Sequence, residues 1–210
     1  MTTRLIYVMD PMCSWCWGFA PVARALAAQA GKKGIGMQLV VGGLRRERMA
    51  MDAAGRQRTL GYWRAVHEAS GQPFDLEAGL PDGLVYDTEP ACRALVTARS
   101  FDEHLAWPLA MRIQQAFYTE RCDVTRPKRL ADLAEAVGLT RGEFADRFDS
   151  QAIRDATEAD FQWARNLGIA GFPTLLAERH GQLALLTNGY QPLETLSPLL
   201  ARWLEHNVHA

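Results

Sequence analysis

Two kinds of hydrophobic pattern alternate in the first part of the chain. A continuous apolar run over 4–9 predicts a short buried strand, and a turn at 10–12 follows it. From Phe19 onward the apolar positions recur at helical spacing as far as Gly31, which is placed to end a helix. A second apolar run over 36–43 ends in two glycines. The pattern therefore predicts a strand, a helix and a second strand, which together form a βαβ unit.

The middle of the chain, 44–157, has an almost entirely helical pattern. Breaks rich in glycine and proline divide it, and about five or six helices fit between them. Asp87–Pro90 indicates a helix cap followed by a first-turn proline, and Thr140–Glu143 has the spacing of a capping box. Pro108 predicts a kink or a boundary within one helix. We interpret the basic run Arg45–Arg48 as the solvated start of the first helix.

The last third of the chain returns to strand patterns. Apolar residues over 172–179 and 183–187 flank a turn at 180–182, which predicts a β-hairpin. A final stretch from about 192 to 205 predicts a helix, which we expect to pack on the sheet and to end in solvent at His206 and His209. Its apolar face consists of Leu193, Leu196, Leu199, Leu200, Trp203 and Leu204.

The order of these elements predicts an α/β protein in two parts. Segments 1–43 and 158–210 together supply the strands of one domain, and 44–157 forms an inserted helical domain. The chain has 210 residues, of which 48% are hydrophobic, so that it can bury a substantial core.

Composition and charge exclude several classes of function. The 23 basic and 24 acidic residues give a net charge of −1, which disfavours binding to nucleic acid. No stretch approaches the ~18 uninterrupted apolar residues of a transmembrane helix, and the N-terminal segment lacks the pattern of a signal peptide. We therefore expect a cytoplasmic protein with no membrane partner, in a compartment where cysteine pairs are usually reduced.

Cys13 and Cys16 form the most informative motif. They lie three positions apart where the first strand gives way to a helix, so both sulfur atoms share one helical face. The free N–H groups and macrodipole at a helix N-terminus favour an anion at Cys13, and the thiolate is the form that attacks a disulfide. The alternative is a zinc site, which needs four ligands. Because neither Cys92, Cys122 nor any histidine completes such a set, we expect redox chemistry and no metal.

Two motifs resemble those of a known superfamily. The run Asp10–Phe19 and the segment Gly171–Thr174 are similar to motifs of the DsbA-like thioredoxin superfamily, in particular its cytosolic, FrnE-related branch of disulfide isomerases. The resemblance spans nearly the whole chain and implies a thioredoxin fold with a large all-helical insertion. It also implies that Cys13 is the attacking thiolate, that Cys16 is the resolving thiol and that Pro173 is a cis-proline facing the pair.

Several further residues are candidates for substrate contact. Pro173 has no N–H, which leaves the backbone of Phe172 free to pair with an extended substrate; the alternative is an ordinary proline at the start of a strand. Trp15 is expected to be exposed at the helix tip, and Ser14 either contacts substrate or simply fits the turn. Trp17 fits substrate contact and internal packing equally well.

The chain also departs from better-known relatives. The dipeptide between its cysteines is neither that of DsbA nor that of thioredoxin, so we do not expect the strong oxidising power of DsbA. Tyr7 stands six residues before the first cysteine, where those relatives keep a buried acid, and a proton acceptor for Cys16 is therefore unidentified. Asp10 is the nearest candidate, although an aspartate before proline is more often a turn residue.

The other two cysteines have simpler interpretations. Cys92 shares a helical side with Leu95 and Val96, which predicts a small, buried apolar role. Cys122 follows a predicted helix end, where we expect it to be exposed. A second redox pair between them would need Cα atoms within about 7 Å of each other.

These patterns predict a thiol–disulfide oxidoreductase or isomerase that acts through a mixed disulfide on a protein or small molecule containing a disulfide or thiol. We expect no bound cofactor, and glutathione is a candidate redox partner. The direction of electron flow, the substrate, the electron donor and the choice between monomer and homodimer stay open. One alternative is a glutathione-dependent isomerase or transferase of the kappa or hydroxychromene carboxylate isomerase type, which usually lacks the full cysteine pair. The other is a non-catalytic, partner-binding protein.

Overall fold

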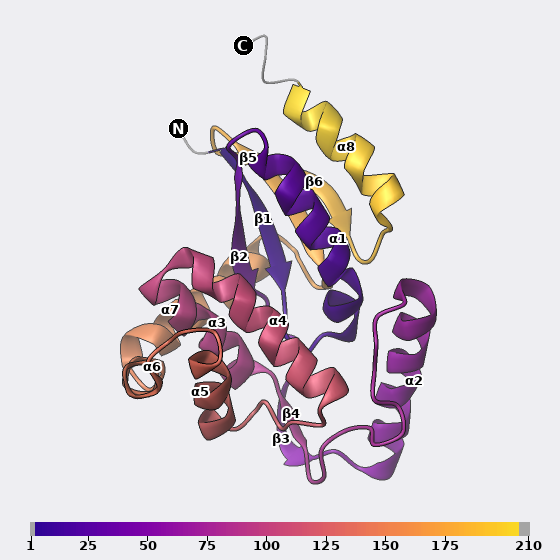
Figure 1. Cartoon of the computed structure of the whole chain (residues 1–210), viewed down its shortest axis with the longest axis vertical. Helices are drawn as coiled ribbons and strands as arrows, with labels where there is room; N and C mark the ends of the chain where they lie inside the picture. The colour runs from indigo at the N-terminus through magenta and orange to yellow at the C-terminus, as the bar shows by residue number, and fades with distance from the viewer. Residues whose placement is uncertain (1–2, 206–210) are drawn as a thin grey trace.

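A four-stranded mixed sheet forms the upper half of the molecule (Figure 1). The computed structural model describes residues 3–205, so the predictions for His206 and His209 lie outside the described residues. The sheet has the order β2-β1-β5-β6, with β1 parallel to β2 and antiparallel to β5. Its strands are β1 (Thr3–Met9), β2 (Gly36–Val41), β5 (Thr174–Arg179) and β6 (Gln182–Asn188). The predicted βαβ unit and the β-hairpin are confirmed.

The central strand β1 is buried on both faces. Leu5 and Tyr7 point into the main hydrophobic core, whereas Ile6 and Val8 point into a smaller cluster on the opposite face. Helices α1 (Ser14–Gly31) and α8 (Leu193–Glu205) cover the first face, and α7 (Gln151–Asn166) covers the second (Figure 1). Burial on both faces explains why the sequence of β1 is a continuous apolar run rather than an alternating one.

The lower half of the molecule is the inserted region. As predicted, it is mainly helical, with α7 completing the set of six helices between β2 and β5. The other five are α2 (Ala53–Ser70), α3 (Glu89–Phe101), α4 (Glu103–Thr119), α5 (Pro127–Glu135) and α6 (Arg141–Phe148). The predicted domain boundary after 157 falls within α7, so the division into two domains stays a prediction.

One expectation for this region is wrong. Arg45–Arg48 does not begin a helix, because Arg46–Ala50 forms strand β3, which pairs antiparallel with β4 (Val85–Asp87). Every residue of β3 is exposed, so no apolar alternation marks it as a strand. Its partner is only three residues long and lies far along the chain. Pairing between distant segments, which local pattern does not reveal, therefore determines this structure.

The predicted helix starts are only partly confirmed. Helix α3 begins at Glu89 with Pro90 in its first turn, as expected. Helix α6 begins at Arg141, but the Thr140 side chain makes no capping hydrogen bond. Pro108 lies inside α4, which runs on to Thr119, so no helix boundary occurs there.

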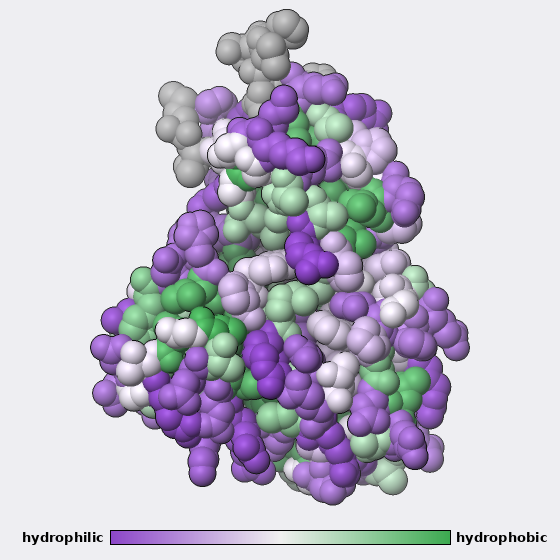
Figure 2. All heavy atoms as spheres, in the orientation of Figure 1, coloured by the Kyte–Doolittle hydropathy of each residue, from purple (hydrophilic) through white to green (hydrophobic). Residues whose placement is uncertain are grey.

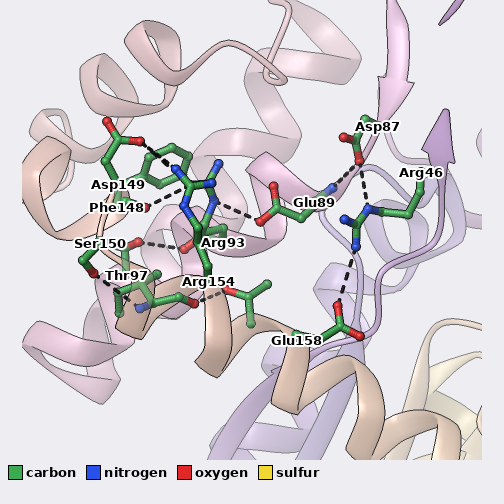
Figure 3. Close-up of polar contacts among 12 residues, drawn as sticks. Arg46, Asp87, Glu89, Arg93, Thr97, Phe148, Asp149, Ser150, Arg154 and Glu158 are labelled. Carbon is green, nitrogen blue, oxygen red and sulfur yellow. Dashed lines mark hydrogen bonds and ion pairs between the residues drawn. The ribbon is translucent and has the colours of Figure 1, made fainter. Parts of the chain in front are cut away.

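A partly buried ion-pair cluster joins two helices of the insert (Figure 3). The Arg93 guanidinium on α3 is 3.0 Å from the carboxylate of Glu89 and donates a hydrogen bond of 3.1 Å to the Phe148 carbonyl. It also lies over the Phe148 ring, 4.0 Å from the centroid, and 3.8 Å from the carboxylate of Asp149. These contacts join α3 to the end of α6.

The surface is mostly polar. Figure 2 shows hydrophilic residues over much of the visible face, with smaller apolar patches between them. Among the described residues, no helix is both long enough and apolar enough to cross a membrane.

Candidate active site

The two motif cysteines lie where β1 ends and α1 begins. Cys13 occupies the N-cap position of α1, and its carbonyl accepts hydrogen bonds from the backbone of Cys16 (3.0 Å) and Trp17 (3.2 Å). The Cys13 amide in turn donates to the Asp10 carbonyl at 3.0 Å. Cys13 is 7% exposed and Cys16 is completely buried. Cys13 is therefore the member of the pair that a substrate can reach.

The second motif lies directly against Cys13. The Phe172–Pro173 peptide bond is cis, and the Cys13 thiol donates to the Phe172 carbonyl at 3.6 Å. The Pro173 carbonyl accepts a hydrogen bond of 2.7 Å from Gly189, which fixes the loop to the end of β6. Two segments far apart in the sequence thus meet at one end of the sheet.

A hollow of about 260 Å³ opens beside this contact, and four residues line it: Trp15, Phe172, Gly189 and Tyr190. The rings of Trp15 and Tyr190 lie 5.6 Å apart, so each supports the other. Ser14 precedes Trp15 on the same turn and is half-buried. The structure therefore brings Ser14, Trp15 and Phe172 together near Cys13, in an apolar setting suited to a peptide side chain.

The surroundings of Cys16 disfavour its ionisation. Burial raises the pKa of the Cys16 thiol well above its usual range, and a hydrogen bond and the charge from Cys13 raise it further. Burial is the main cause that raises the pKa of Tyr7, and the charges of Cys16 and Cys13 add to it. Tyr7 occupies the position six residues before Cys13 at which this chain lacks an acid. The Tyr118 hydroxyl is buried, and its pKa is raised by burial and by charges that include both cysteines. These surroundings therefore favour the neutral thiol of Cys16.

Asp10 is the buried acid of this region. It is completely buried, and its carboxylate accepts hydrogen bonds from the amides of Met12 (2.8 Å) and Leu44 (2.7 Å). The Thr88 hydroxyl and the Cys92 thiol donate to the same carboxylate, at 2.6 and 3.4 Å. The bond from Met12 belongs to a turn, as expected, but those from Leu44, Thr88 and Cys92 extend beyond it. Local sequence shows only the turn, because these three partners come from elsewhere in the fold.

A comparison with protein families agrees with this geometry. The model of the DSBA-like thioredoxin domain matches residues 4–201. The chain belongs to this family. The fold is accordingly a DSBA-like thioredoxin fold with a mixed sheet and a mainly helical insertion.

Solved structures of several proteins are similar to this DSBA-like protein. A candidate protein disulfide isomerase from Nitrosomonas europaea is 37% identical with a TM-score of 0.91, and all of both chains is covered. The cytosolic disulfide reductase DsbM from Pseudomonas aeruginosa is 28% identical with a TM-score of 0.77, over 95% of this chain and 98% of that one. A second DsbM structure, with GSH, is also similar, with a TM-score of 0.75.

More distant relatives carry less information about function. The ClpXP adapter protein SpxH of Halalkalibacterium halodurans is 23% identical over 172 residues, which are 80% of this chain but only 56% of that protein. A 2-hydroxychromene-2-carboxylate isomerase shares 14% identity with a TM-score of 0.67, over 97% of both chains, and shows the fold alone.

The remaining cysteines of this DSBA-like protein lie outside the exchange motif. Cys92 is completely buried as predicted, but its thiol also donates to Asp10 and is not simply apolar in role. Burial raises the pKa of Cys92 well above its usual range, and the charge of Asp10 adds to this. Cys122, which the sequence predicts to be exposed, is half-buried. All four cysteines are free, and no three His, Cys, Asp or Glu side chains within residues 3–205 cluster as metal ligands.

Trp17 packs internally. It is 6% exposed, its indole N–H donates to the Pro73 carbonyl at 2.8 Å, and its ring stacks on Tyr118. Gln72 donates to the Trp17 carbonyl at 2.9 Å. Trp17 therefore fastens the cysteine helix to the insert, whereas Trp15, two residues earlier, lines the hollow.

Proposed function

We propose that this protein is a thiol–disulfide oxidoreductase that works by dithiol–disulfide exchange. The observation that carries the proposal is Cys13, which keeps 7% of its surface exposed beside the Phe172 carbonyl, with the completely buried Cys16 one helical turn behind it. The Cys13 thiolate attacks one sulfur of a substrate disulfide, forms a mixed disulfide and expels the other sulfur as a thiolate. Cys16 then gives up its proton and attacks the Cys13 sulfur, so that the pair becomes oxidised and the substrate leaves as a dithiol.

The hollow beside Cys13 is the proposed substrate site. Its rings accept an apolar side chain, while the backbone at Phe172 accepts the main chain of an extended peptide. Ser14, Trp15, Phe172 and Pro173 are the substrate-binding residues of this proposal. A disulfide in an extended or locally unfolded segment is the substrate class that fits such a shallow, open site.

Net reduction of substrate disulfides in the cytoplasm is the direction we propose. Support comes from DsbM, a cytosolic disulfide reductase similar to this chain over nearly its whole length, and from the DsbM structure with GSH. Two glutathione molecules would return the oxidised pair to the dithiol and leave as glutathione disulfide, without a bound cofactor. The similarity to the Nitrosomonas europaea protein favours isomerisation as a second outcome of the same chemistry.

The experiment that tests the proposal is equilibration of the protein in glutathione buffers of graded redox ratio. Tryptophan fluorescence follows the change, because Trp15 and Trp17 flank Cys16, and mass spectrometry of trapped thiols identifies the bond. We expect a Cys13–Cys16 disulfide with a potential between about −120 and −270 mV, the range of known exchange catalysts. A pair that does not cycle would overturn the proposal.

Two other functions predict different results. A glutathione-dependent isomerase or transferase needs no resolving thiol, so Cys16→Ser would keep full activity toward a glutathione adduct. A partner-binding protein, as the similarity to the adapter SpxH suggests, would keep its biological role when both cysteines are serine. Under the proposed function both variants lose net disulfide exchange.

A further inference from the structure

The carboxylate of Asp10 joins three separate parts of the molecule. Met12 belongs to the cysteine turn, Leu44 follows β2, and Thr88 begins helix α3 of the insert. All three donate to this one carboxylate, at 2.6 to 2.8 Å. Distances of this kind are typical of charge-assisted hydrogen bonds.

The same residue also holds the cysteine turn through its main chain. The Asp10 carbonyl accepts the Cys13 amide at 3.0 Å, so the residue fixes the turn from both its backbone and its side chain. Tyr86, in strand β4 of the insert, donates to the Met12 carbonyl at 2.5 Å and supports the turn from a second direction. The insert therefore holds the segment just before Cys13 through hydrogen bonds, in addition to its contacts with Trp17 after the pair.

We propose that Asp10 is a positioning residue for disulfide exchange, and that its bond to Thr88 couples the helical insert to the Cys13–Cys16 pair. This inference rests on the proposed function and identifies how the insert sets the redox equilibrium of the site. Asp10 acts in two ways. It holds Cys13 and Cys16 in reach of each other, which favours the disulfide, and its negative charge beside the pair opposes a thiolate, which disfavours the reduced form.

Both effects of Asp10 favour the oxidised pair, so weakening Asp10 shifts the equilibrium in one direction. Burial raises the pKa of Asp10 above its usual range, and the bonds from Thr88, Leu44, Met12 and Cys92 offset part of this rise and so favour the carboxylate. Losing the Thr88 hydroxyl removes one of these donors and leaves the turn in place. The change at Thr88 therefore tests the coupling without altering Asp10 itself.

The experiment compares four single variants with the wild-type chain in one glutathione buffer. Asp10→Asn removes the charge at constant size, Thr88→Val removes the hydroxyl, and Thr88→Ser keeps it. The matched control is Asp160→Asn, because Asp160 is also largely buried and accepts the Val41 amide at 3.1 Å and the Arg99 guanidinium at 2.9 Å. Trapped-thiol mass spectrometry gives the ratio of reduced to oxidised pair, and urea unfolding gives stability.

We expect Asp10→Asn to raise the ratio of reduced to oxidised pair about tenfold, which corresponds to losing one hydrogen bond to a charged group. We expect Thr88→Val to raise the ratio of reduced to oxidised pair about threefold, because it removes only one of the hydrogen bonds that hold Asp10. Thr88→Ser and Asp160→Asn keep the wild-type ratio, even where Asp160→Asn lowers stability. If Asp10→Asn does not fold, the contrast between Thr88→Val and Thr88→Ser decides the question.

Several results would overturn the inference. An unchanged ratio in Thr88→Val shows that the insert is not coupled through this bond, and an equal shift in Asp160→Asn shows a general effect of loosened packing. A wild-type pair that does not equilibrate with glutathione removes the proposed function itself. A wild-type pair that does equilibrate, with Asp10→Asn unchanged, removes only the role of Asp10.

Discussion

Two buried polar regions of the molecule differ in how their groups are paired. Around Arg93, which is 5% exposed, the charge meets the Glu89 and Asp149 carboxylates, the Phe148 carbonyl and the Phe148 ring (Figure 3), although its Nε atom makes no hydrogen bond in the described part of the chain. Around the cysteine pair, by contrast, the completely buried Tyr118 hydroxyl has no hydrogen-bond partner in the described part of the chain. Two buried thiols there also have strongly raised pKa values.

The difference indicates that the Arg93 cluster contributes to stability, whereas the region around the cysteines contributes to the reaction. A buried charge with partners on several sides ties elements together, and removing one partner leaves another charge unsatisfied. A buried thiol or hydroxyl with spare hydrogen-bonding capacity lowers stability, and that capacity is available when charge develops during a reaction. The Arg93 cluster should therefore respond to substitution in stability alone, and the cysteine region in activity.

The largest expected effect is on activity. Cys13→Ser should lower disulfide reduction by about 1,000-fold or more, because it removes the attacking thiolate. Cys16→Ser should instead accumulate a mixed disulfide between Cys13 and the substrate, since the resolving thiol is missing. Mass spectrometry of quenched reactions distinguishes the two. Equal accumulation of the adduct in both variants would contradict the assigned roles.

The next effect is on stability. Arg93→Met should lower the free energy of unfolding by about 3 kcal/mol, because Glu89 is left in a largely buried site without its cation. Arg154→Met is the matched control. Its ion pair with Asp149 is 3.4 Å long and solvent-exposed, so we expect a loss of only about 0–1 kcal/mol. Urea unfolding measures both changes, and a shifted Cys13–Cys16 potential in Arg93→Met would break the separation between the two regions.

The two regions also differ in what the sequence could predict. The βαβ unit, the hairpin and α8 follow from apolar runs and helical spacing, because burial determines those positions locally. Cys13 and Cys16 are identifiable from the sequence because two cysteines three positions apart at the start of a helix are typical of a redox pair. Strand β3 is not identifiable from the sequence, since all its residues are exposed and its partner β4 lies far along the chain. The role of Arg93 is not identifiable from the sequence either, because its partners at the end of α6 are brought close only by tertiary packing.

Asp10 is a further residue of the site whose main contacts cannot be predicted from local sequence. Its position before Pro11 indicates a turn, and the bond from the Met12 amide belongs to that turn. Its partners Leu44 and Thr88 come from the segment after β2 and from the start of α3, and no local pattern links them to Asp10. A polar residue directly after a buried strand was the one available signal.

The third prediction concerns alkaline pH. Burial raises the pKa of Cys16 in the folded protein, whereas unfolded thiols ionise near about 8.5. Above that pH the folded state binds more protons than the unfolded state, so the free energy of unfolding of the reduced protein should fall as pH rises. Each such thiol contributes up to about 1.4 kcal/mol per pH unit.

The oxidised protein is the control for this prediction, because its disulfide leaves no thiol proton at Cys13 or Cys16. Its stability should fall less steeply between pH 8 and 9.5, since Cys92 still contributes in both forms. Urea unfolding of the two forms at each pH gives the slopes. Parallel slopes would show that Cys16 is not held as a thiol by burial.

The smallest expected effect tests the comparison most directly. Tyr118→Phe removes a buried hydroxyl without a partner and keeps the ring that packs on Trp17 and Trp63, so the free energy of unfolding should rise by up to about 1 kcal/mol. Tyr86→Phe removes a hydroxyl that donates to the buried Met12 carbonyl, so it should lower stability by about 1–2 kcal/mol. Opposite signs for two neighbouring tyrosines cannot come from ring packing, which both variants preserve. If Tyr118→Phe also slows disulfide exchange while it stabilises the fold, the unpaired hydroxyl serves the chemistry at the expense of stability. A loss of stability in both variants would instead show that the Tyr118 hydroxyl contributes to stability as the Tyr86 hydroxyl does.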